Sequence, residues 1–346
     1  MRTIYWDYEN ECVRLIDQTK LPDSLEVISC KSVEELAEAI KRLSIRGAPA
    51  LEAAGGYGVA LAANIAKDMP AAEAKEFIRY KAELLSKTRP TAVNLFCGIE
   101  RVLKTALNAE DPEEIARLAL DEAEKIANED VERNRRMGRY GAELIPDNAV
   151  VITYCNTGRL ATVDWGTALG VVRSAVEQGK KVEVIACETR PLNQGSRLTC
   201  WELMQDGIDT TLITDSMAGY VMRKRKIDCV IVGADRIVRD AVFNKVGTYS
   251  LAILAKEHGI PFYVAAPSTT FDWNKSEEDV VVEERSREEL TYCNVKCMKT
   301  LIAPENVKIY NPAFDATPLS YVTALITEKG IIKKPYSVNV PKVLGF

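Results

Sequence analysis

The chain has 346 residues, of which 47% are hydrophobic and 27% charged, a composition typical of a globular protein. Its length favours about two domains. The net charge is −5 with both signs mixed along the chain, which argues against binding to nucleic acid or to an anionic membrane. No apolar run is long enough to cross a bilayer, and the first residues lack a signal-peptide pattern. We therefore expect a cytoplasmic protein whose nine cysteines stay reduced.

The chain has one histidine and few closely spaced cysteines, so the usual ligands of zinc are scarce. The tightest cysteine pair is Cys293 and Cys297, no second pair completes a tetrahedral site, and His258 is the only histidine. We expect no metal. His258 precedes Gly-Ile-Pro, which indicates a structural residue in the last turn of a helix. Acid–base chemistry is therefore expected from carboxylates, lysine, tyrosine or cysteine.

The first third of the chain has helical periodicity. Ser32 and Glu35 form a capping box ahead of an apolar run, and further helices are predicted over 71–86, 92–107 and 113–145. The last is long and highly charged and could bridge two domains. We predict a mainly helical domain over 1–115, a connecting helix over 116–145 and a Rossmann-like catalytic domain over 146–346.

From about residue 147 short apolar runs alternate with helical patterns. Such runs indicate a parallel sheet covered on both faces, so the predicted class is α/β. In these sheets ligands bind at the carboxyl ends of the strands. The expected strands are AVVITYC (149–155), VEVIAC (182–187), TTLIT (210–214), CVIVGAD (229–235), PFYVAAP (261–267) and VKIYNP (307–312).

The glycine patterns disfavour nucleotide binding. Residues 155–158 read Cys-Asn-Thr-Gly rather than G-x-G-x-x-G, and Gly55-Gly56-Tyr57-Gly58 falls in a helical region rather than after a strand. No P-loop pattern occurs. We expect no cofactor.

Two strand ends carry candidate reactive groups. Cys155 ends one apolar strand ahead of a helix, whose N–H groups can stabilise a thiolate, although a buried core cysteine is the more common interpretation of such a residue. Asp235 ends another strand. Burial there would raise its pKa and suit a general acid, whereas a helix cap or a partner for Arg236 explains it equally well.

Several segments suit a phosphorylated, hydroxyl-rich ligand. Arg46 precedes Gly47, Ala48 and a helix start, and Arg89 precedes Pro90 in the same way. A guanidinium beside free helix N–H groups binds phosphate. Further donors follow later in the chain: Gln194, Asn244 and Lys245.

At these residues the chain closely resembles the methylthioribose-1-phosphate isomerase family. The resemblance implies conversion of S-methyl-5-thioribose 1-phosphate to S-methyl-5-thioribulose 1-phosphate, a small helical domain beside a Rossmann-like domain, and a homodimer. It implies that Asp235 is the proton donor and Cys155 the second catalytic residue. It assigns Arg46, Gly47, Ala48, Arg89, Gln194, Asn244 and Lys245 to substrate binding. The matching stretches include IRGAPA (45–50), RPTAVNL (89–95), CNTGRLAT (155–162), ETRPLNQGSRLT (188–199), GADRI (233–237), NKVGTY (244–249) and NPAFDATP (311–318).

This reaction suits a chain with one histidine. The anomeric carbon bears phosphate, so the ring cannot open to a free aldehyde, and an acid must protonate the ring oxygen, the role assigned to Asp235. The C2 hydrogen then reaches C1 by proton transfer or by hydride shift, with Cys155 as base or gate. The sequence leaves both routes open.

Three departures from the family border the expected site. Leu51-Glu52 replaces Ile-Gly, the segment 236–243 lacks the common Asn-Gly-Asp, and Tyr154 stands where many relatives have histidine. Two alternatives therefore stay open. One is a related pentose-phosphate isomerase acting on 5-deoxyribose 1-phosphate or ribose 1,5-bisphosphate, and Arg159 could contact its second phosphate. The other is a non-catalytic regulatory subunit of the translation-initiation nucleotide-exchange factor.

Overall fold

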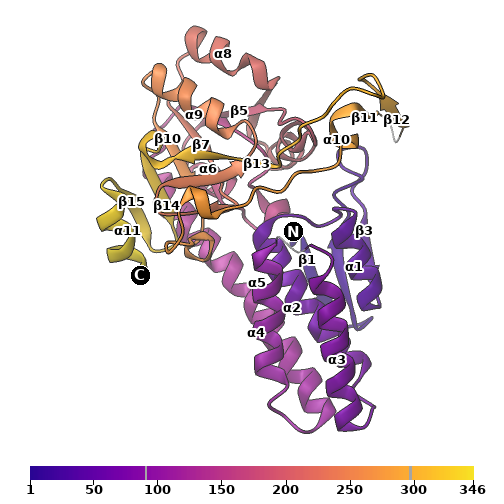
Figure 1. The fold of residues 1–346 in the computed structure, drawn as a ribbon. Helices are drawn as coiled ribbons and strands as arrows, with labels where there is room; N and C mark the ends of the chain where they lie inside the picture. Colours follow the sequence, from indigo (N-terminus) through magenta and orange to yellow (C-terminus); the bar gives the residue numbers. More distant parts are fainter. Residues whose placement is uncertain (90–91, 296–297) are drawn as a thin grey trace. The chain divides into compact units, whose positions relative to one another are not determined.

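The computed structural model describes residues 1–89, 92–295 and 298–346 (Figure 1). The chain divides into two compact units. Unit 1 comprises residues 1–133 and 158–166, and unit 2 comprises residues 134–157 and 167–346. The predicted division at residues 115 and 145 stays a prediction.

Unit 1 begins with a three-stranded antiparallel sheet, followed by helices that run alongside one another in Figure 1. The α1 helix has the expected capping box, because Ser32 accepts from the backbone of Glu35 and the Glu35 side chain accepts from the backbone of Ser32. The elements are β1 (Ile4–Asp7), β2 (Cys12–Ile16), β3 (Val27–Cys30), α1 (Val33–Lys41), α2 (Ala48–Ile65), α3 (Ala71–Ser86), α4 (Val93–Ala106) and α5 (Pro112–Ala142), whose residues from 134 onward belong to unit 2.

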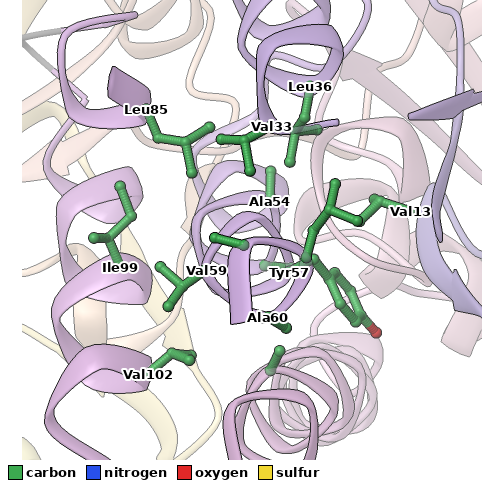
Figure 2. Close-up of a cluster of buried hydrophobic side chains, with 14 of the residues drawn as sticks. Val13, Val33, Leu36, Ala54, Tyr57, Val59, Ala60, Leu85, Ile99 and Val102 are labelled. Atoms are coloured by element: carbon green, nitrogen blue, oxygen red, sulfur yellow. The ribbon is translucent and has the colours of Figure 1, made fainter. Parts of the chain in front are cut away.

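The core of unit 1 surrounds α2, which packs against α1, α3 and α4. Figure 2 shows Tyr57 and Val59 of α2 among side chains of its neighbours, including Leu85, Ile99 and Val102. The helix is buried on almost every side because it consists largely of alanine and glycine. A Cβ at Gly55 would lie 2.5 Å from the Leu95 carbonyl oxygen, so the glycine run lets α4 approach closely.

Unit 2 contains a seven-stranded sheet with the order β15-β14-β10-β7-β4-β5-β6. All neighbouring pairs are parallel except β14 with β15, which are antiparallel. The strands are β4 (Ala149–Thr153), β5 (Val182–Cys187), β6 (Asp209–Ile213), β7 (Cys229–Val232), β10 (Phe262–Ala265), β14 (Ala324–Thr327) and β15 (Gly330–Lys333).

The strand order has a direct consequence for a binding site. From β6 through β14 it is the 3-2-1-4-5-6 order of a Rossmann fold, and the order reverses between β4 and β7. Ligands bind outside the carboxyl ends of the two strands at such a reversal, where the connections leave in opposite directions. Cys155 follows β4 and Asp235 follows β7. The topology therefore places both expected catalytic residues at the same edge of the sheet.

Helices and a second small sheet complete unit 2. The helices are α6 (Ala168–Glu177), α7 (Cys200–Gln205), α8 (Ala218–Lys224), α9 (Thr248–Glu257), α10 (Glu288–Thr291) and α11 (Tyr336–Leu344). The small sheet has the order β13-β9-β8, formed by β8 (Arg236–Ile237), β9 (Ala241–Lys245) and β13 (Phe314–Pro318), and in a separate two-stranded sheet β11 (Tyr292–Val295) pairs antiparallel with β12 (Met298–Leu301). Among the described residues, no helix is both long and apolar enough to cross a membrane.

The expected α/β class, its parallel sheet and the expected helices are confirmed. Five of the six expected strands occur as β4, β5, β6, β7 and β10. The strand expected over 307–312 is wrong, because that segment runs without regular structure, with Val307 and Tyr310 exposed. The Gly55–Gly58 run lies within α2, as expected.

Candidate active site

The loop after β4 holds Cys155 in an uncommon conformation. Its φ is +64°, in the left-handed region that residues other than glycine rarely adopt, and its side chain is buried with 8% exposure. Its N–H donates to Thr189 Oγ1 at 2.8 Å, and its carbonyl oxygen accepts from Thr199 Oγ1 at 2.7 Å. Two threonine hydroxyls therefore hold both backbone groups of this residue.

A buried polar network continues from the next residue. Asn156 Nδ2 donates to Glu202 Oε1 at 2.6 Å, and the fully buried Glu202 accepts from Arg173 Nη2 at 2.7 Å. Arg173 Nε also donates to Asp206 Oδ2 at 2.7 Å. Burial opposes the charge of Arg173, but the two carboxylates together hold its pKa above the usual value. The network therefore keeps Arg173 charged and connects it through Glu202 to Asn156, the residue after Cys155.

The loops after β4 and β7 are in contact. A Cβ at Gly233, which follows β7, would lie 2.7 Å from Cγ2 of Thr157. The Thr157 carbonyl oxygen accepts from the backbone N–H of Thr167, the residue before α6, at 2.9 Å. Only glycine allows this approach, and Gly233 stands two residues before Asp235. The geometry thus links the segment of Cys155 to the segment of Asp235.

Asp235 lies at the start of the small sheet. Its N–H donates to the Phe243 carbonyl oxygen at 2.9 Å, beside the pairing of Arg236 with Phe243. The expectation that Asp235 is buried is wrong, because the residue is exposed. It follows β7 by three residues, and the chain has already left the buried part of the sheet there. Its position at the strand end, and not desolvation, supports it as a candidate acid.

Asn244 and Lys245 end β9 and are both buried. Asn244 Nδ2 donates to Thr248 Oγ1 at 3.0 Å. Lys245 Nζ donates to the Ala313 carbonyl oxygen at 2.9 Å and lies 4.9 Å from the centroid of the Phe314 ring. The N–H of Asp235 donates to Phe243, and Asn244 and Lys245 are the next two residues along β9. They therefore lie close in sequence to the residue that holds the backbone of the candidate acid.

An aspartate caps the helix beside these residues. Asp315 pairs with Asn244 in the sheet and accepts from the N–H of Gly247 at 2.6 Å and of Tyr249 at 3.2 Å. Burial raises the pKa of Asp315 to about 6, although both backbone donors and Lys245 act in the opposite direction. This carboxyl was not among the expected site residues. The signal for it was its place in the family-like stretch NPAFDATP (311–318).

Gln194 lies in the segment after β5. It is buried, and its Oε1 atom has no hydrogen-bond partner within the described part of the chain. A Cβ at the next residue, Gly195, would lie 1.7 Å from the Cys187 carbonyl oxygen, so the backbone runs directly against the end of β5. A buried acceptor without a partner is costly, which favours a ligand that donates to it.

Tyr154, one of the departures from the family, is buried with its hydroxyl near Gly247. Burial raises the pKa of Tyr154, and Asp215 raises it further through its charge and a hydrogen bond. Asp215 follows β6 and also accepts from the backbone N–H of Thr189 at 2.8 Å. The Tyr154 side chain therefore stays neutral and connects the end of β4 to Asp215 at the end of β6. Asp215 in turn contacts Thr189, which follows β5.

Unit 1 carries the other expected substrate-binding residues: Arg46, Gly47, Ala48 and Arg89. Gly47 is the N-cap of α2, and among the described residues no side chain caps this helix, a setting that suits an anion. Because Gly47 has no Cβ, the backbone of Ala161 can approach it closely. A Cβ at this position would lie 2.0 Å from the Ala161 carbonyl oxygen. Arg89 Nη1 donates to the Arg46 carbonyl oxygen at 3.4 Å, which brings the two arginines together. Pro90 lies outside the described residues.

The departure at Glu52 is a buried carboxyl inside α2. Burial raises its pKa, while the charge of Arg133 and a hydrogen bond from Asn94 lower it. Asn94 lies in the first turn of α4. Glu52 therefore joins α2 to α4 rather than presenting a free charge to a ligand.

The structure thus groups the expected site residues by unit: Cys155, Gln194, Asp235, Asn244 and Lys245 in unit 2, and Arg46, Gly47, Ala48 and Arg89 in unit 1. Sequence analysis missed Thr199, Glu202 and Arg173, whose polar side chains sit in helical segments that look ordinary. Within residues 1–89, 92–295 and 298–346 no group of three or more His, Cys, Asp or Glu could hold a metal ion. Cys297 lies outside the described residues, so the pair with Cys293 is not described.

Comparison with known proteins identifies the family. A model of the initiation factor 2 subunit family matches residues 44–334. A methylthioribose-1-phosphate isomerase from Thermotoga neapolitana is 49% identical, with 100% of this chain and 99% of that protein covered.

Two solved structures extend this finding. The 5-methylthioribose 1-phosphate isomerase from Pyrococcus horikoshii OT3 is 45% identical, with a TM-score of 0.93 over 99% of this chain and 96% of that one. The translation initiation factor eIF-2B, subunit delta, from A. fulgidus is 68% identical, with a TM-score of 0.92 over 100% of both chains. The chain therefore belongs to the initiation factor 2 subunit family, within the group whose members include the methylthioribose-1-phosphate isomerases.

Proposed function

We propose that this protein is an aldose–ketose isomerase that converts S-methyl-5-thioribose 1-phosphate to S-methyl-5-thioribulose 1-phosphate in methionine salvage. The observation that carries the proposal is the placement of Cys155 and Asp235 after β4 and β7, the strands between which the sheet order reverses. Relatives about half identical over the full chain, which bear the isomerase name, support the same reaction.

Asp235 is the acid of the proposed reaction. Its side chain is exposed, so a substrate can reach it, and its backbone is fixed by the hydrogen bond to Phe243. Protonation of the ring oxygen opens the sugar ring without requiring a free aldehyde at the phosphate-bearing C1. A positioned acid contributes about 10²–10⁴-fold to such a step.

Cys155 serves the transfer of hydrogen from C2 to C1. In the proton route its thiolate removes the C2 proton, which gives the C1–C2 enol, and returns that proton to C1. In the hydride route the C2 hydrogen moves with its electron pair to the C1 cation left by ring opening, beside the thiol. In both routes the C2 hydroxyl gives up its proton as the ketone forms, and this proton restores the acid form of Asp235. Both routes begin with the acid step of Asp235. Both also need the thiol in one fixed position.

Substrate binding falls to the remaining residues. Gln194 offers a buried acceptor to a sugar hydroxyl, and Asn244 and Lys245 offer a donor and a cation. For Arg46, Gly47, Ala48 and Arg89 the proposal rests on the family resemblance and on the start of α2, which no side chain of the described residues caps and which suits a phosphate. Arginine adds a bidentate partner for that phosphate.

A second candidate is a role in translation initiation, because the A. fulgidus structure that is 68% identical is described as an initiation-factor subunit. A third is isomerisation of a related pentose phosphate. Arg159 bears on the third candidate as a further cation, but it already pairs with Asp164 at 3.8 Å. The two isomerase candidates require that the chain turns over a sugar phosphate, whereas the role in translation initiation does not.

The test is an assay of the purified protein with S-methyl-5-thioribose 1-phosphate, 5-deoxyribose 1-phosphate and ribose 1,5-bisphosphate, with the ketose product quantified by NMR. We expect the methylthio sugar to have the highest kcat/KM. A higher value for another sugar would identify the pentose-phosphate alternative. Turnover of none of the three would contradict the isomerase proposal and favour the initiation-factor role.

The setting of the enzyme is also part of the proposal. We expect a homodimer in the cytoplasm that acts without nucleic acid, cofactor or metal. The net charge of −5 supports the expectation that the enzyme does not bind nucleic acid. Exposed apolar side chains on neighbouring helices, Tyr220 of α8 with Tyr249 and Ile253 of α9, support self-association. Sedimentation equilibrium at micromolar concentration should give twice the chain mass, and a monomer would contradict the dimer.

A further inference from the structure

We propose that Thr189 and Thr199 are positioning residues that hold the Cys155 thiol in its reactive place, an inference that rests on the proposed function for its kinetic part. Neither threonine contacts the reacting atoms in this scheme. Each acts through the backbone of Cys155, one on its N–H and the other on its carbonyl oxygen.

The conformation of Cys155 needs such support. A residue with a Cβ at φ +64° is disfavoured by about 1 kcal/mol or more relative to the right-handed region, so it persists only where its surroundings impose it. Cys155 lies two residues after β4, and no proline or glycine adjoins it to impose the turn. The hydrogen bonds to the two threonines supply the constraint.

Each threonine hydroxyl both accepts and donates, so its orientation is itself fixed. Thr189 Oγ1 accepts from the Cys155 N–H and donates to the Cys187 carbonyl oxygen at 3.0 Å. Thr199 Oγ1 accepts from Asn156 Nδ2 at 3.3 Å and donates to the Cys155 carbonyl oxygen. Both threonines are fully buried, so water cannot replace these bonds.

The segment that carries Thr199 is built for this contact. It is the last residue of a π-helical turn, Gly195–Thr199, that runs directly into α7. Such turns are rare and occur often at functional sites. Three residues later, Glu202 accepts from Asn156 and pairs with Arg173, which fixes the same loop a second time. The structure therefore joins Cys155 to β5 through Thr189 and to α7 through Thr199.

The experiment uses Thr189→Val and Thr199→Val in the full-length protein. Valine has nearly the volume of threonine, so these variants remove the hydroxyl bonds without opening a cavity or leaving a buried charge. Thr327→Val is the matched control. Thr327 is equally buried, and its hydroxyl donates to the Gly330 carbonyl oxygen and accepts from the Lys329 N–H, but it lies in the β14–β15 hairpin, apart from the Cys155 loop.

Two readouts separate positioning from general stability. We expect kcat to fall about 10–100-fold in each test variant with KM within about two-fold, because a small displacement of a reacting group mainly affects the transition state. Independently of any substrate, we expect iodoacetamide to alkylate Cys155 about five-fold faster in the test variants, measured by peptide mass spectrometry, because the loop opens locally more often. Thr199→Ser should restore both values.

The control should lose a similar amount of thermal stability with unchanged kcat and alkylation rate. If the test variants match Thr327→Val in both readouts, the positioning role is overturned. If the wild-type protein turns over no sugar phosphate, the proposed function fails, but the alkylation rates still decide whether the threonines position the thiol.

Discussion

The two strand ends that meet at the reversal of the sheet differ sharply. After β4, Cys155 is buried, adopts a left-handed backbone and has its N–H and carbonyl bound by threonine hydroxyls. After β7, Asp235 is exposed, its N–H donates to the Phe243 carbonyl oxygen, and its segment continues into a small antiparallel sheet. The side of the candidate site after β4, here called the rigid side, is buried and held by hydrogen bonds. The side after β7, here called the open side, exposes its candidate acid to solvent.

The difference teaches how the two candidate catalytic groups could divide their work. A thiol that must meet one carbon of a substrate benefits from a fixed, enclosed position. An acid that must exchange its proton between turnovers benefits from contact with solvent.

Replacing the two reactive groups should have the largest effect. We expect Cys155→Ser and Asp235→Asn each to lower kcat by about 10³-fold or more, since each change removes an acid–base or nucleophilic group. Steady-state kinetics and circular dichroism melting check this. Near-normal kcat in either folded variant would remove that residue from the mechanism.

The rigid side depends on a buried ion pair. Arg173→Ala leaves the fully buried Glu202 without its cation, and we expect a loss of about 3–5 kcal/mol in the free energy of unfolding. Arg225→Ala is the matched control, because Arg225 pairs with Glu183 at the surface and its loss should cost at most about 1 kcal/mol. Urea denaturation of both variants measures the difference, and equal losses would contradict the special role of the buried pair.

The contact between the two sides depends on Gly233. Gly233→Ala places a methyl group 2.7 Å from Thr157 Cγ2, and we expect a loss of about 1–3 kcal/mol in stability together with reduced kcat. Thr157→Ser removes Cγ2 and should recover part of that loss in the double variant. A double-mutant cycle with no coupling would show that the two loops do not constrain each other.

The open side should show a small dependence on pH through Asp315. Its pKa in the folded protein is raised to about 6 from 3.8, so the stability that its protonated form contributes is present below pH 3.8 and is lost as pH rises through about 6. Relative to Asp315→Asn, the wild-type protein should therefore lose about 1 kcal/mol between pH 4 and pH 7, an amount that allows for screening of a partly exposed group. Urea denaturation at four pH values checks this. A difference that stays constant or grows in favour of the wild type would contradict it.

Much of the fold was predictable because its signals are local. Apolar runs predicted β4, β5, β7 and β10, and Ser32 with Glu35 predicted the start of α1. The segment 307–312 also contains apolar residues, but only its end is paired, through an isolated bridge between Pro312 and Glu284, and the rest stays irregular. Strands β1 to β3 are short, β1 and β3 are only partly buried, and pairing across turns, which periodicity does not report, stabilises all three.

The candidate site was predictable in position but not in environment. The strand pattern places Cys155 and Asp235 at strand ends, where Cys155 alone was interpreted as a buried core residue and Asp235 as a buried acid, a helix cap or a partner for Arg236. The structure confirms that Cys155 is buried among core residues, but in a left-handed conformation, and it leaves Asp235 exposed. The left-handed backbone of Cys155 depends on Thr189 and Thr199, which lie 34 and 44 residues away in the sequence. Exposure of Asp235 depends on where the chain leaves the sheet.

The claim that Cys155 and Asp235 serve one substrate site can be tested directly by protection of the thiol. In the Asp235→Asn variant, which should bind substrate without turning it over, Cys155 should be alkylated by iodoacetamide at least about ten-fold more slowly with saturating S-methyl-5-thioribose 1-phosphate than without it. Cys97, an exposed cysteine on α4, is the internal control and should react equally fast in both samples. Equal alkylation of Cys155 with and without bound sugar phosphate would contradict the account.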